Sequence, residues 1–122
     1  AALAMAGLAG FEHAGVAALA HGQRRQLEIA MVLAASPKLL LLDEPMAGMS
    51  HAESASVVTM LQALKGRYTI LLVEHDMDAV FALADRITVL VYGRAIASGT
   101  ADQIRNNADV REAYLGDQEL PA

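Results

Sequence analysis

The chain has 122 residues, of which 55% are hydrophobic and 19% are charged. This composition excludes a disordered chain, and the length allows one domain at most. Nine Lys and Arg residues against fourteen Asp and Glu residues give a formal net charge of −5. An acidic chain argues against nucleic acid as a main partner, because phosphate-binding surfaces need positive charge. With no cysteine, the chain forms no disulfide or Cys-ligated zinc site, and we expect a cytosolic protein.

The first twenty residues are rich in Ala and Leu but do not fit a membrane or export segment. Glu12 and His13 interrupt the apolar run, glycines break it, and no basic region precedes it. We expect a short helix at residues 1–6 and a loop up to Ala20. Because the chain does not begin with Met, we expect it to be a fragment or one half of a larger domain.

Helices and strands alternate in the middle of the chain. Residues 23–35 have one wide apolar face, which predicts a helix. Four leucines at 39–42 and the run at 69–73 are short and continuously apolar, which predicts parallel strands buried on both faces. Between them, Ser50 and Glu53 form a capping box that predicts a helix to about residue 65.

The last third of the chain follows the same reasoning. We expect a short helix at 77–84, a strand at 87–91 and a hairpin return at 95–98. Thr100 and Gln103 form a second capping box, which predicts a short helix to about Asn106. A last short helix at 110–115 and a frayed tail from Gly116 follow. The alternation predicts an α/β fold with a mostly parallel sheet flanked by helices and a C-terminal β-hairpin.

Polar side chains follow both predicted parallel strands, at the edge where such sheets carry functional groups. Asp43 can hold Mg²⁺ beside a nucleotide phosphate, and Glu44 can polarise an attacking water. His75 lies 31 positions after Glu44 (75 minus 44), which can return it to the same edge, where it can donate to a phosphate oxygen. The alternatives are two solvated acids and a histidine that caps the sheet edge.

The helix that follows Leu19-Ala20-His21-Gly22-Gln23 starts without a good capping residue. An uncapped start next to glycine leaves backbone N–H groups and the positive end of the helix dipole free for an anion. The alternative is a first turn that is simply hydrated.

Together, LAHGQ at 19–23, LLLLDEP at 39–45 and VEH at 73–75 resemble the C-terminal half of an ATP-binding-cassette (ABC) nucleotide-binding domain. The finer resemblance is to the ATPase subunits of branched-chain amino acid importers. It is carried by the stretches HGQRRQLEIAMVLAASPKLLLLDEPMAGMS and ILLVEHDMDAVFALADRITVLVYGRAIASGT and by the ending VREAYLG. ATPases of urea and amide importers remain the alternative.

The resemblance implies the C-terminal part of a P-loop NTPase domain, without its P-loop half. Residues 1–35 would be the end of the helical subdomain and the signature helix. Residues 36–98 would be the sheet region from the Walker B strand to the switch histidine, and residues 99–122 the C-terminal helices and tail.

The resemblance also implies roles for single residues. Asp43 would hold Mg²⁺ through water, Glu44 would be the general base, and His75 would contact the γ-phosphate of ATP. Residues 19–23, here called the signature segment, would bind the γ-phosphate of ATP held by a partner subunit, and Ser50 in the D-loop would communicate across that dimer. The residues of the signature segment are Leu19, Ala20, His21, Gly22 and Gln23.

The complete subunit would then be an ATPase that uses ATP and Mg²⁺ to power an importer. Its partners would be a second ATP-binding subunit, transmembrane permease subunits and, indirectly, a solute-binding protein, at the cytoplasmic face of the plasma membrane. Nucleic acid is not expected. A DNA-repair or chromosome-structure ATPase with a related head is disfavoured by the acidic charge and the absence of a heptad insert.

The chain also departs from the family. Ala20 stands where the family has a signature serine, Ser50 stands where the D-loop often ends in Asp, and G-x-x-x-x-G-K-[ST] occurs nowhere in the chain. We therefore expect the 122-residue chain alone to be inactive. A second class of function stays open, namely a cassette-like binding protein without turnover.

Overall fold

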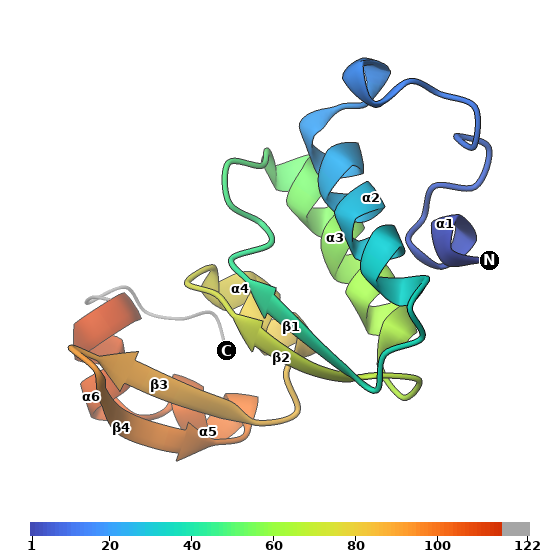
Figure 1. The fold of residues 1–122 in the computed structure, drawn as a ribbon. Coiled ribbons are helices and arrows are strands. Elements are labelled where there is room, and N and C mark those ends of the chain that lie inside the picture. Colours follow the sequence, from blue (N-terminus) through green and yellow to red (C-terminus); the bar gives the residue numbers. More distant parts are fainter. Residues whose placement is uncertain (116–122) are drawn as a thin grey trace. The chain divides into compact units, whose positions relative to one another are not determined.

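A computed structural model describes residues 1–115 of the chain (Figure 1). The chain divides into two compact units, Ala1–Ala79 and Val80–Ala122, and each is described by itself. Among the described residues, no helix is both long enough and apolar enough to cross a membrane. The predicted tail from Gly116 lies outside the described residues.

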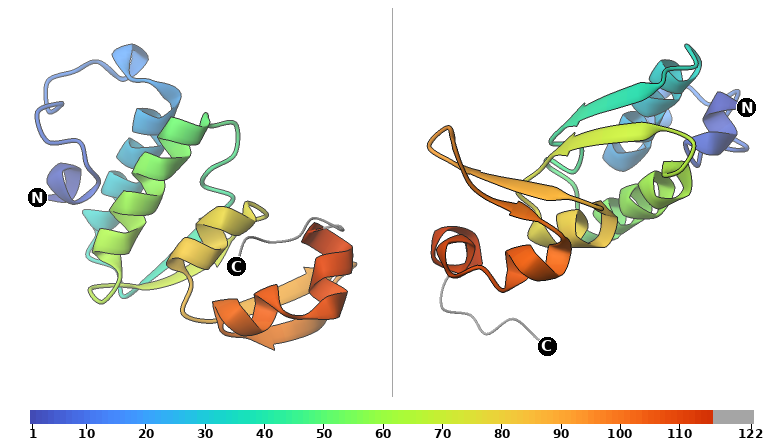
Figure 2. Two further views of the ribbon diagram at one scale, coloured as in Figure 1. Left: turned by 180° about the vertical axis from the view of Figure 1, so that it is seen from behind. Right: turned by 90° about the horizontal axis from the view of Figure 1, so that it is seen from below.

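The first unit is built on two parallel strands. Strand β1 (Leu39–Asp43) pairs with β2 (Thr69–Val73) in a register that runs from Leu39↔Thr69 to Asp43↔Val73. Helices α2 (His21–Leu33) and α3 (His51–Leu64) pack side by side on one face of this sheet, as the views in Figure 2 show. The predicted parallel strand pair is therefore confirmed. The unit also contains α1 (Ala2–Met5) and a 3₁₀ turn at Val16–Ala18, and the boundary between the two units falls within α4 (Met77–Leu83).

The core of this unit lies between α2, α3 and the covered face of the sheet. Its aliphatic side chains are almost fully removed from water, and burying each one contributes about 1.5–3 kcal/mol. All the side chains of this core are apolar. The core side chains are Leu8, Ile29, Leu33, Leu40, Val57, Met60, Leu61 and Leu64.

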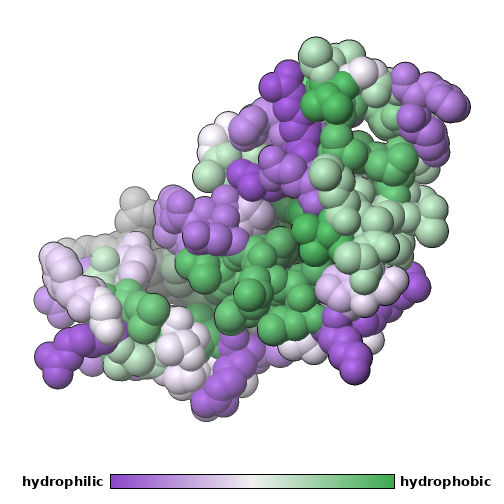
Figure 3. Space-filling view, in the orientation of Figure 1, coloured by the Kyte–Doolittle hydropathy of each residue, from purple (hydrophilic) through white to green (hydrophobic). Residues whose placement is uncertain are grey.

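The prediction that β1 and β2 are buried on both faces is wrong. Leu40 is 1% exposed, whereas Leu41 is 67% exposed and Leu71, on the same face as Leu41, is 58% exposed. The reason is that α2 and α3 cover only one side of the sheet (Figure 2). Hydrophobic side chains therefore gather on the surface over β1 and β2, as Figure 3 shows.

The second unit contains the predicted hairpin. Strands β3 (Ile87–Val91) and β4 (Arg94–Gly99) are antiparallel. The two residues between them, Tyr92 and Gly93, have φ values of 49° and 75°, as tight hairpin turns require. Beyond the hairpin lie α5 (Ala101–Arg105), α6 (Ala108–Val110) and a π-helical turn at Arg111–Leu115. This unit has its own small core of Ile87, Val89, Ile104 and Val110.

Both predicted capping boxes are present. The Ser50 hydroxyl accepts from Glu53 N at 3.2 Å, and the Glu53 carboxylate accepts from Ser50 N at 2.9 Å. Thr100 and Gln103 exchange the same two bonds at the start of α5. The helix predicted at 23–35 instead spans His21–Leu33, because its start is capped by a side chain from within the first turn, as described below.

The uneven burial of β1 predicts unequal effects of two neighbouring truncations. In the 122-residue chain, we expect Leu40→Ala to lower the free energy of unfolding by about 2–5 kcal/mol, since it opens a cavity in the core. Leu41→Ala removes an exposed side chain and should cost less than about 0.5 kcal/mol. Urea unfolding followed by circular dichroism measures both. Equal losses would contradict the one-sided sheet.

Candidate functional site

The carboxyl ends of β1 and β2 meet at one edge of the sheet. Asp43 pairs with Val73, and Glu44 N continues the ladder by donating to the Val73 carbonyl at 2.7 Å. The polar residues that follow the two strands are therefore neighbours, although 31 positions separate Glu44 from His75. We call this edge, with Asp43, Glu44, Glu74 and His75, the carboxyl edge.

Glu44 and His75 are in direct contact at this edge. His75 Nδ1 lies 3.0 Å from Glu44 Oε1, and the two side chains are 71% and 50% exposed. The placement of His75 beside Glu44 that the spacing suggested is therefore observed. Glu44 has a φ of 47°, a left-handed conformation that costs a residue with a side chain about 1 kcal/mol or more. This conformation turns the chain out of β1 into the loop, where Ala47 N donates to the Glu44 carbonyl.

Glu74 has a larger part in this edge than the sequence indicated. Its side chain is 1% exposed, and its carboxylate accepts from the backbone N–H groups of Met46 at 3.3 Å, His75 at 3.0 Å and Asp76 at 3.4 Å. Glu74 is not among the site residues that the sequence predicted. The missed signal is the period of two along β2, which turns Glu74 inward like Ile70 and Leu72.

Asp43 lies exposed at the end of β1. Residues 1–115 contain no group of three or more His, Cys, Asp or Glu side chains that could hold a metal ion. Mg²⁺ commonly needs only one or two carboxylates, because nucleotide phosphates and water complete its coordination. The donors at this edge therefore fit Mg²⁺ that arrives with a nucleotide, and do not form a cation cage of their own.

Ala20, the N-cap residue of α2, makes no side-chain cap bond, as its residue type predicts. The side-chain oxygen of Gln23 accepts from Ala20 N at 2.9 Å, which is the half of a capping box that glutamine can supply. His21 turns its ring toward the loop after β1, where Nε2 donates to the Ala47 carbonyl at 3.2 Å. Leu19 is buried, so its side chain does not face a ligand.

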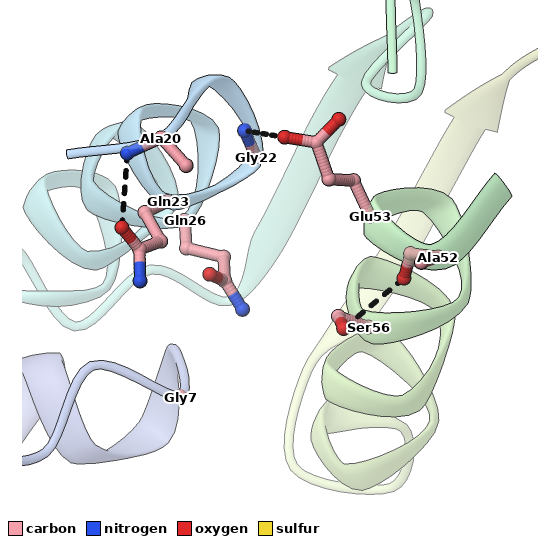
Figure 4. A pocket seen from close by; sticks show the side chains of 8 residues that line it. All are labelled: Gly7, Ala20, Gly22, Gln23, Gln26, Ala52, Glu53 and Ser56. Carbon is pink, nitrogen blue, oxygen red and sulfur yellow. Dashed lines mark hydrogen bonds between the residues drawn. The ribbon is translucent and has the colours of Figure 1, made fainter. Parts of the chain in front are cut away.

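The N–H of Gly22 is not free for an anion either. It donates to Glu53 Oε1 at 3.1 Å (Figure 4), while Glu53 Oε2 accepts from Ser50 N at 2.9 Å. The acceptor comes from α3, which begins 30 positions after His21 (51 minus 21), so no local pattern revealed it. These bonds lower the pKa of Glu53, mainly through the Ser50 N–H and then the Gly22 N–H.

A pocket of about 380 Å³ opens beside this contact, between the starts of α2 and α3 (Figure 4). Its lining is mostly small or polar. Ser50 itself is outside it, with its hydroxyl engaged in capping α3. The residues that line the pocket are Gly7, Ala20, Gly22, Gln23, Gln26, Ala52, Glu53 and Ser56.

The buried carboxylate at the carboxyl edge gives a prediction for stability. Glu74→Ala leaves the N–H groups of Met46, His75 and Asp76 without their acceptor, and each buried orphan donor costs about 1–3 kcal/mol. We expect a loss of about 2 kcal/mol or more in the free energy of unfolding, measured with urea. Glu28→Ala is the matched control, because that exposed carboxylate makes only a helix-surface pair with Arg25 and should cost about 0.5 kcal/mol or less. Losses of similar size for the two variants would contradict the role of Glu74.

Two family models match the sequence. The one described as "Branched-chain amino acid ATP-binding cassette transporter" matches residues 96–119, and the one described as "ABC transporter" matches residues 1–47. The high-affinity branched-chain amino acid transport ATP-binding protein LivG of Escherichia coli (strain K12) is 46% identical over 110 residues, which are 87% of this chain and 43% of LivG. BraF, the protein of the same description in Pseudomonas aeruginosa, is 41% identical over 109 residues, which are 88% of this chain and 43% of BraF.

The fold is also similar to solved structures of ATP-binding cassettes. The ADP conformation of MJ1267, an ATP-binding cassette of an ABC transporter, superposes with a TM-score of 0.83 at 29% identity, covering 95% of this chain and 48% of that one. The chain spans about 43% of the length of its relatives LivG and BraF. On these matches, the chain belongs to the family of ABC transporter ATP-binding domains.

Proposed function

We propose that the carboxyl edge is the hydrolytic site of an ATPase subunit that powers an ABC importer. The observation that carries the proposal is the contact of 3.0 Å between Glu44 Oε1 and His75 Nδ1 where two parallel strands end. A carboxylate and an imidazole that are both accessible can act on a water and a phosphate at the same place. A core histidine or a merely solvated pair of acids would not need the left-handed turn at Glu44.

In the proposed mechanism, Glu44 is the general base. Its Oε1 is engaged by His75, which leaves Oε2 to accept the proton of the attacking water. His75 Nδ1–H donates to Glu44, so the ring carries a second donor, on Nε2, only as the imidazolium. In that form the ring would donate from Nε2 to an oxygen of the γ-phosphate, and Glu74 holds the His75 backbone through its N–H.

Asp43 completes the proposed edge. Its carboxylate would hold Mg²⁺ through water beside the phosphates of ATP, where the ion supplies neutralisation of phosphate charge. Water-mediated binding fits an exposed aspartate that belongs to no group of three or more possible metal ligands within residues 1–115. The donors for the β-phosphate are not among the motifs of this chain, and we assign them to the rest of the complete subunit.

The signature segment would act at the nucleotide site of a second subunit. We propose that the start of α2, with Leu19, Ala20, His21, Gly22 and Gln23, meets the ATP held by a second subunit, and that Ser50 lies at the loop that faces that subunit. Two chains would then close two nucleotide sites. The positive end of the α2 dipole suits a phosphate, although the Gly22 N–H is occupied by Glu53.

We infer that the transported solutes are branched-chain amino acids, supported by the family model over residues 96–119 and by the names of LivG and BraF. The partners would be transmembrane permease subunits at the cytoplasmic face of the plasma membrane, with a solute-binding protein acting through them. An ATPase of this kind touches neither the solute nor the solute-binding protein.

The proposal predicts the effect of one substitution in the complete subunit. Glu44→Gln keeps the size of the side chain but removes the base, so steady-state ATP hydrolysis should fall by about 10²–10⁴-fold. ATP binding should survive, because the amide keeps the shape of the site, and an ATP-bound dimer should accumulate. Phosphate release and equilibrium binding of a fluorescent ATP analogue measure the two properties.

The control is Glu28→Gln, which makes the same chemical change on the exposed surface of α2 and should leave both properties unchanged. Turnover of the Glu44→Gln subunit at the wild-type rate would remove the base assignment. Loss of ATP binding together with turnover would instead mean that Glu44 is a structural residue.

A further inference from the structure

We propose that Glu53 is a positioning residue that fixes the signature segment to the D-loop, the loop at residues 46–50. The proposal deepens the function argued above and rests on it. It assigns no contact between Glu53 and nucleotide. Instead, Glu53 would hold the start of α2 in the orientation in which a partner's ATP can be received.

The first support is the way Glu53 divides its carboxylate. Oε1 accepts from Gly22 N at 3.1 Å and Oε2 accepts from Ser50 N at 2.9 Å. One rigid, planar group therefore joins the backbone of the signature segment to the last residue of the D-loop, and Figure 4 shows its bond to Gly22. Hydrogen bonds to a charged acceptor are about twice as strong as neutral ones and fix geometry more tightly.

The second support is the close approach of the two helix starts at Gly22. A Cβ on Gly22 would lie 3.2 Å from both Cβ and Cγ of Glu53, closer than side chains normally pack. Glycine at this position therefore lets the stem of Glu53 pass directly against the α2 backbone. This explains why Gly22 is buried without invoking a bound phosphate.

The third support is a second link between the same two segments. His21 Nε2 donates to the Ala47 carbonyl at 3.2 Å, so neighbouring residues of α2 are tied to both ends of the D-loop. The carboxylate remains ionised under ordinary conditions, since its bonds to Ser50 and Gly22 lower its pKa. Two ties from adjacent residues resist rotation of the helix start as well as its displacement.

These contacts decide between two roles for Glu53. A carboxylate that merely filled an empty anion site would need only the Gly22 N–H, and a phosphate could replace it. Glu53 also caps its own helix through Ser50, so moving it away would break the start of α3 as well. We therefore expect Glu53 to stay in place when ATP binds. Donors of the signature segment other than the Gly22 N–H must then meet the phosphate.

The test uses the complete subunit with the Glu44→Gln background, in which ATP-driven dimers accumulate. Glu53→Ala removes both bonds, Glu53→Gln keeps one acceptor oxygen, and Ser56→Ala is the control on the same helix. Ser56 lines the same pocket but donates only to the Ala52 carbonyl of its own helix. Sedimentation velocity measures dimerisation in ATP, and fluorescent-ATP titration measures binding by the single subunit.

We expect Glu53→Ala to weaken ATP-driven dimerisation by roughly 10- to 100-fold, since small misplacements of a binding group cost that much. The affinity of the single subunit for ATP should stay within about twofold, because the two oxygens of Glu53 contact only the signature segment and the D-loop. Glu53→Gln should recover part of the loss, and Ser56→Ala should match its parent. A purely structural role would lower ATP binding and the unfolding midpoint together.

Three outcomes would overturn the proposal. Dimerisation of Glu53→Ala at the level of the parent would show that the tie is dispensable. Tighter dimerisation of Glu53→Gln than of the parent would show that the carboxylate competes with phosphate. Equal losses of ATP affinity and dimerisation would show a structural role. If the Glu44→Gln parent itself forms no dimer in ATP, the proposed function fails instead, which separates the two claims.

Discussion

The parallel register of β1 and β2 is the constraint on which the candidate site depends. Asp43 opposite Val73 is the last pair of the ladder, and the bond from Glu44 N to the Val73 carbonyl extends it by one residue. Because side chains alternate between faces, a slip of one strand by one residue would turn its inward side chains to the surface, Leu40 in β1 or Glu74 after β2. Leu40 in the core resists that slip, so the same packing that stabilises the unit also aligns Glu44 with His75.

Two glutamates hold the loops around this frame, and both do so through backbone N–H groups. Glu74 binds the N–H groups of Met46 and His75 and so joins the loops that follow β1 and β2. Glu53 binds those of Gly22 and Ser50 and so joins the starts of α2 and α3. A carboxylate suits this task because it offers several acceptor positions without a donor. The loop between β1 and α3 is therefore fixed at both its ends, which fits a segment that carries function.

Local patterns predicted the elements well because their causes are local. Four leucines followed by two acids mark a strand and its end, and Ser50 with Glu53 marks a helix start within four residues. The shared edge of Glu44 and His75 followed from the general geometry of parallel sheets. The inward direction of Glu74 and the cap that Gln23 supplies to Ala20 also had local signals, in the period of β2 and in the spacing of three residues.

Two features could not be predicted from the sequence, because their causes lie far away along the chain. Burial of a strand on one face or two depends on which helices cover it, and four leucines in a row are compatible with both. The acceptor for Gly22 N is a carboxylate from another helix, and nothing around residues 19–23 indicates it. Both errors came from treating a segment as though its neighbours in sequence were its neighbours in space.

The central claim is that Glu44 and His75 act as one unit on ATP in the complete subunit. Single-turnover hydrolysis of bound ATP, which resolves slow rates, can be measured for Glu44→Gln, His75→Ala and the double variant. When two residues act together, the rate losses caused by substituting them are not additive in free energy. The account therefore predicts that the double variant is about as slow as Glu44→Gln alone. If the two single losses multiply in full in the double variant, the residues act independently and the account is contradicted.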